Sequence, residues 1–88
     1  MGLSINLGDK FSAGNHISVT VITRTCESKG TPDAAVKYVD GDNIDHVIKL
    51  IDDDKYKLRF FIPEDAKGKV QVSLKLGSDS FDEEVAIG

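Results

Sequence analysis

Apolar and polar residues alternate along several short segments of the chain, which is the period of two expected of a strand with one buried face. The clearest case is VQVSLKL, residues 70–76, where Val and Leu occupy one face and Gln, Ser and Lys the other. YKLRFFI, residues 56–62, alternates in the same way until Pro63 removes a ladder donor. No segment of normal helix length shows a 3.6-residue period, so the pattern predicts an all-β protein.

Gly, Pro, Asn and Asp mark the turns between these segments. Short strands that recur about every 8 to 12 residues are typical of two packed sheets. We therefore predict a seven-stranded antiparallel immunoglobulin-like β-sandwich, with a five-stranded barrel as the main rival. The chain shows no internal repeat or linker, so residues 1–88 are predicted to form a single domain, expected to be a module of a longer protein. The predicted strands are residues 3–7, 16–23, 34–39, 46–51, 56–62, 70–76 and 81–87.

The stretch from residue 52 to residue 81 follows a recognisable order of features. An acidic turn precedes a Tyr that opens an alternating strand, and a Pro, a Gly, a second alternating strand and a Ser-containing turn before an aromatic residue follow. This order resembles a filamin-type repeat, an immunoglobulin-like module of actin-crosslinking rods. Bacterial surface immunoglobulin-like modules share much of the pattern, because the hairpins of any β-sandwich need turn residues, a Pro and strands with alternating faces. The residues that carry the resemblance are Asp54, Tyr56, Leu58, Phe60, Pro63, Gly68, Val70, Val72, Leu74, Ser80 and Phe81.

The resemblance implies a non-enzymatic structural and protein-interaction module, one repeat of a cytoskeletal, actin-crosslinking protein in the cytoplasm. The alternative is an extracellular bacterial module that serves adhesion or display on the cell surface. Such a module could be stiffened by bound Ca²⁺ or could lack the ion. Neither reading implies a cofactor. The oligomeric state stays open.

Residues 34–39 and 46–51 carry apolar side chains on both faces, whereas a half-buried edge strand should have a polar outer face. In filamin-like repeats the groove between the corresponding strands accepts an extended peptide as an added strand. The resemblance thus implies a partner-binding edge within residues 34–51. Its expected lining is Val36, Tyr38, Ile48 and Leu50, or else their opposite-face neighbours Ala35, Val39, Val47 and Ile51. A twisted edge strand, or a neighbouring domain in a longer chain, would also bury both faces.

Charge and cysteine content narrow the classes of partner. With 11 Lys and Arg against 15 Asp and Glu, the net charge is -4, which predicts no nucleic-acid partner and no anionic membrane surface. The longest apolar run is far shorter than the roughly 20 residues of a membrane helix. Cys26 has no second cysteine to pair with, which favours a reducing compartment.

Two acidic clusters carry the hard oxygen atoms that Ca²⁺ prefers. Residues 40–45 contain three Asp, but Ile44 and Ile51 occupy positions where a helix-flanked calcium loop needs oxygen ligands. Residues 52–54 follow the next strand and should therefore lie at the opposite end of the sandwich. We predict solvated turns without a metal ion, whose Asp side chains bond their own backbone.

The remaining reactive side chains are too few for recognisable catalysis. His16 and His46 are the two imidazoles, and a zinc site needs three or four ligands. Cys26 lacks the surroundings of a catalytic nucleophile and is expected to be a buried or half-buried strand thiol. An enzyme would be favoured only if Cys26 were selectively reactive in the folded protein.

Overall fold

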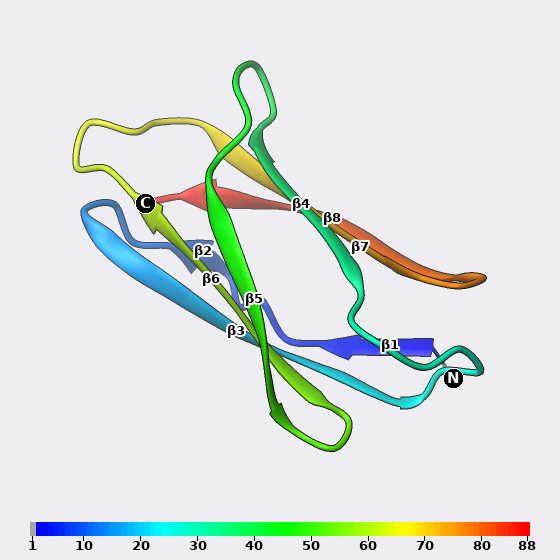
Figure 1. Ribbon diagram of the computed structural model, residues 1–88. Coiled ribbons are helices and arrows are strands. Elements are labelled where there is room, and N and C mark those ends of the chain that lie inside the picture. The colour runs from blue at the N-terminus through cyan, green and yellow to red at the C-terminus, as the bar shows by residue number, and fades with distance from the viewer. Residues whose placement is uncertain (1) are drawn as a thin grey trace.

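Two four-stranded sheets face each other in the computed structural model, which describes residues 2–88 (Figure 1). The first sheet has the order β1 (Gly2–Ile5), β3 (Asn15–Thr25), β6 (Lys55–Ile62) and β5 (His46–Asp52). The second has the order β2 (Lys10–Phe11), β8 (Asp79–Ile87), β7 (Lys69–Leu76) and β4 (Asp33–Tyr38). The predicted all-β sandwich is confirmed.

The structure adds an eighth strand that the alternation did not predict. The expected strand over residues 3–7 is β1, which runs antiparallel to β3, and the two-residue β2 then pairs in parallel with β8. Gly8 separates the two with a φ of 80°, a conformation that Gly adopts without steric cost. The amino-terminal segment therefore belongs to both sheets.

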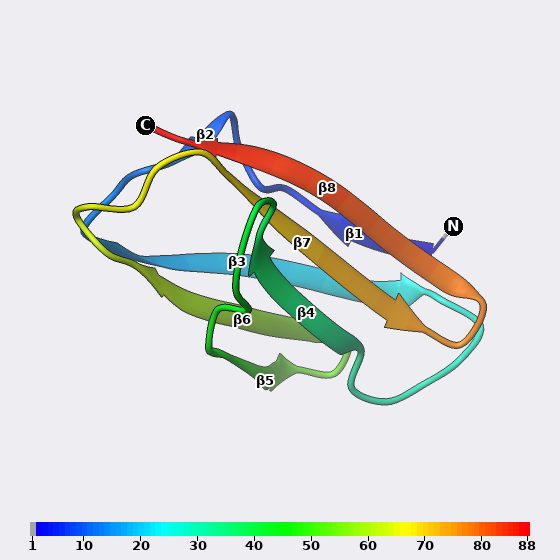
Figure 2. The same cartoon turned by 90° about the horizontal axis from the view of Figure 1, so that it is seen from above.

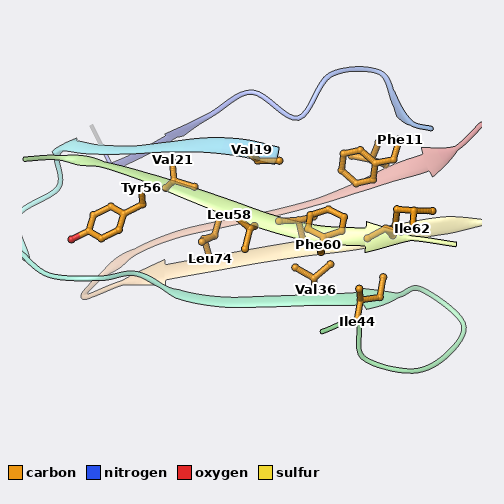
Figure 3. Close-up of a cluster of buried hydrophobic side chains, with 13 residues drawn as sticks. Phe11, Val19, Val21, Val36, Ile44, Tyr56, Leu58, Phe60, Ile62 and Leu74 are labelled. Atoms are coloured by element: carbon orange, nitrogen blue, oxygen red, sulfur yellow. The ribbon is translucent and has the colours of Figure 1, made fainter. Parts of the chain in front are cut away.

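The core lies between the sheets and is centred on β6, whose alternate side chains Tyr56, Leu58, Phe60 and Ile62 are all buried (Figure 3). Val36 and Leu74 approach them from the opposite sheet. Complete burial of such side chains contributes about 1.5 to 3 kcal/mol each. The ring of Phe11 meets that of Phe60 edge-on, with centroids 5.3 Å apart, so an aromatic contact fixes the short β2 on the core.

The loop between β4 and β5 folds back on β4 (Figure 1). The Ile44 amide donates to the Val36 carbonyl at 2.7 Å, and the Tyr38 amide donates to the Asp42 carbonyl at 3.0 Å. The side chain of Ile44 is buried with the core. Apolar burial and two backbone hydrogen bonds thus hold residues 42–44 beside the end of β4.

Replacement of Leu58 by Ala should destabilise the domain by about 2 to 5 kcal/mol, because this side chain is completely buried and its loss leaves a cavity. Leu50→Ala on the neighbouring strand is the matched control, since Leu50 is 61% exposed, and should change stability by about 0.5 kcal/mol or less. Urea denaturation measures both. Equal losses in the two variants would contradict the described core.

Candidate protein-interaction edge

Each sheet of the sandwich ends in margins where backbone N–H and C=O groups have no neighbouring strand. Such margins invite pairing with another chain, and proteins usually protect them. The first sheet ends at β1 and β5, and the second at β2 and β4. The protection of these margins differs, which makes it possible to rank them as binding sites.

The β4 margin is partly closed by the chain itself. Residues 42–44 are hydrogen-bonded to the backbone of Val36 and Tyr38, as described above, and the middle one forms an antiparallel bridge with Lys37. Residues 33–35 are left open, beside a shallow hollow of about 330 Å³ on the outer face of the second sheet. The open part of β4 is therefore only three residues long.

Two other margins are protected by their length or charge. β1 has four residues, and its register shifts between Gly2 and Ser4. β2 covers β8 only at Ala86 and Ile87. Along the uncovered part of β8, the exposed Glu83 lies directly across from the buried Val72, on the inward face. An inward charge of this kind opposes the addition of another strand.

Over residues 46–50 the β5 margin is neither closed by another part of the chain nor given a charge on its inward face; Lys49 is on the outer face, and the register shift between Leu50 and Asp52 lies at the end of the strand. Figure 2 shows β5 at the outside of the molecule. Ile48 and Leu50 pair with the buried Leu58 and Tyr56, so they are on the inward face. Val47 is on the outer face and is 52% exposed. β5 thus presents apolar side chains on both faces beside a free row of backbone groups.

The four residues predicted to bind a partner do not lie in equivalent places. Val36 is a core residue, and Tyr38 and Ile48 are half-buried against that core. Leu50 is well exposed. The structure therefore leaves Leu50 accessible along β5 and Ile48 partly accessible, whereas Val36 contributes to stability. Partner binding at these positions stays a prediction.

The outer face of the first sheet is cationic, which the net charge did not predict. Lys49 lies directly across from Lys57, and Arg59 lies across from Val47. In residues 2–88 the one ion pair within 4.0 Å joins Arg24 and Asp54, so these three cations have no carboxylate partner at that distance. The signal in the sequence was the alternation of Lys49 with apolar residues, and of Lys57 and Arg59 with Leu58 and Phe60.

A hollow of about 400 Å³ opens on this cationic face. The exposed ring of Phe61 forms part of its wall and lies 5.0 Å from the His16 ring, centroid to centroid. The hollow therefore combines apolar walls with nearby cations and one carboxylate. Its lining residues are His16, Asp45, His46, Val47, Lys49, Arg59, Phe60 and Phe61.

The two acidic clusters lie at opposite ends of β5, as predicted (Figure 1). In the turn after β5, the Asp53 amide donates to the Asp52 carboxylate at 2.8 Å, which is the expected use of an Asp side chain in a turn. Asp54 accepts a bond of 2.9 Å from Arg24, and its carbonyl accepts from the Thr23 amide. Within residues 2–88, no three His, Cys, Asp or Glu side chains gather where they could hold a metal ion.

Cys26 is buried just after β3, with 4% of its surface exposed. Burial raises the pKa of its thiol, and the negative charge of Asp79 raises that pKa further, against a smaller opposing effect of Lys29. Because the thiolate is the reactive form, these surroundings oppose nucleophilic chemistry. No helix within residues 2–88 has the length and apolar character needed to cross a membrane.

The arrangement of the two sheets defines the class of fold as an immunoglobulin-like sandwich. A solved structure described as the Lin-41 filamin domain matches this chain with a TM-score of 0.78 and 17% sequence identity, over 98% of this chain and 91% of that one. The fold is thus of the filamin immunoglobulin-like type, as the sequence resemblance implied. Neither a family model nor a curated protein sequence matches the chain.

A thiol reagent should modify Cys26 at least about tenfold more slowly in the folded protein than in the unfolded one, because the folded thiol is buried and its pKa is raised. Asp79→Asn should accelerate the reaction at pH 8, since loss of the charge lowers that pKa. Asp82→Asn on the outer face of β8 is the matched control and should have little effect. Rapid, selective labelling of folded wild-type protein would contradict this environment and favour the enzyme hypothesis.

Proposed function

We propose that this protein is a non-enzymatic interaction module that binds an extended segment of a protein partner as an added strand along β5. The observation that carries the proposal is the open β5 margin over residues 46–50, with exposed apolar side chains on both faces. The other sheet margins among residues 2–88 are short, carry an inward-facing charge or are partly closed by the chain.

An added strand would take backbone hydrogen bonds from β5, and each would contribute about 0.5 to 1.5 kcal/mol net. Side chains of the partner would alternate between the two faces. Inward ones would cover Ile48 and Leu50, which face the interior side of the sheet. Outward ones would lie beside Val47 and Lys49. Backbone bonds would provide affinity, and these side-chain contacts would provide selectivity.

The wider role rests on the filamin-type resemblance in sequence and fold. This resemblance supports the proposal that the protein is one repeat of a cytoplasmic, actin-crosslinking protein. In that role the module would hold neighbouring domains apart and offer β5 to a partner strand. A neighbouring domain of the same chain could also supply the strand that pairs with β5. The proposed role requires no cofactor, nucleic acid or membrane.

A neutral peptide that alternates Val with Thr tests strand addition without a contribution from charge. Titration into isotopically labelled protein should shift the backbone amides of residues 46–52 and of the adjoining β6. A peptide with Pro at its central position should bind much more weakly, because Pro removes a ladder donor. Shifts confined to residues 33–35 would place the site on β4, and the absence of any shift at millimolar peptide would overturn the proposal.

Replacement of Leu50 by Asp should weaken binding of the neutral peptide about tenfold or more, because a charge on the inward face of β5 would lie against the added strand. The fold should survive, since Leu50 is largely exposed. Val39→Asp alters another exposed apolar residue, outside β5, and should leave the affinity unchanged. Equal weakening by both variants would contradict a site on β5.

A further inference from the structure

We infer that the partner strand is acidic on its outer face, with a carboxylate beside Lys49 and a bulky apolar side chain two residues away, beside Val47. This inference rests on the proposed binding along β5 and specifies the chemistry of its partner. It follows from the cationic face and the hollow of the first sheet, and from the acidic residues that flank β5.

The pairing of Lys49 with Lys57 is the main observation. Like charges directly opposite each other on neighbouring strands destabilise a sheet. The Arg59 guanidinium is on the same face, two residues along β6 from Lys57. With no carboxylate of residues 2–88 within 4.0 Å of these three groups, an anion from outside the domain would relieve their repulsion.

An added strand would lie about 4.8 Å from β5, so the side chain opposite Lys49 would start about 5 Å from it. A Glu or Asp at that position would meet the Lys49 ammonium directly, with Lys57 on the next strand behind it. Two residues along the partner, the outward side chain would lie opposite Val47, which lines the near side of the hollow, whereas Arg59 and Phe61 belong to β6 on the far side of β5. A bulky apolar group there would pack on Val47 and reach across it toward the hollow.

Acidic residues at both ends of β5 limit the size of the anion. Asp45 is in the hollow before the strand, and Asp52 ends the strand and leads into the Asp53 turn. A single carboxylate fits between these acids, whereas a polyphosphate chain that continued past them would be repelled.

The test uses two variants of the neutral Val and Thr peptide, in which one outward Thr is replaced by Glu or by Lys. The Glu peptide should bind wild-type protein about three- to tenfold more tightly than the Lys peptide at low salt, and the difference should shrink as salt is added. Lys49→Glu should reverse this preference. Lys57→Glu should reduce it, because Lys57 lies behind Lys49. Fluorescence anisotropy of labelled peptides measures each affinity.

Lys75→Glu is the matched control, since Lys75 is exposed on the outer face of the opposite sheet, and the preference for Glu should persist in this variant. Equal affinity of the Glu and Lys peptides for wild-type protein would overturn the acidic partner while leaving strand addition intact. Failure of all three peptides to bind would remove the proposed function itself. Tighter binding of an oligothymidylate than of the Glu peptide would also contradict the inference, because it would indicate that the cationic side chains bind a nucleic acid.

Discussion

The fold depends on the burial of one face of β6 between the two sheets. Tyr56, Leu58, Phe60 and Ile62 form a row along this strand, and the sheet opposite closes over them. Because successive side chains of a strand point to opposite faces, the same strand must expose its intervening residues on the outer surface. Lys57, Arg59 and Phe61 are those residues. The constraint that builds the core therefore also places two cations and an aromatic ring beside β5.

The sequence was sufficient to predict the strands that alternate most regularly. Residues 56–62 and 70–76 lie within β6 and β7, because one face of each strand is buried and the other is solvated. β2 could not be predicted in this way, since two residues are too few to show a period. It is held by pairing with the far end of the chain and by the contact of Phe11 with Phe60.

The candidate site was only partly predictable for a related reason. The apolar residues on both faces of residues 46–51 were visible in the sequence, but the difference between β4 and β5 depends on the loop between them. Residues 42–44 hydrogen-bond to β4 through backbone groups, which leave no pattern in side-chain types. The cationic face was hidden for another reason: the net charge of -4 averages Lys49, Lys57 and Arg59 with acids on other surfaces. The pairing of strands is what brings these three residues together.

The central claim is that β5 is the margin where a partner strand adds, and protection of its backbone amides from hydrogen exchange tests this most directly. Exchange would be followed at each amide, with and without saturating Glu peptide. Alternate amides within residues 46–50 should slow about tenfold or more on binding, because those on the free side of β5 would become hydrogen-bonded, while residues 33–35 should be unchanged. Protection confined to residues 33–35, or no new protection in β5 at saturation, would contradict the account.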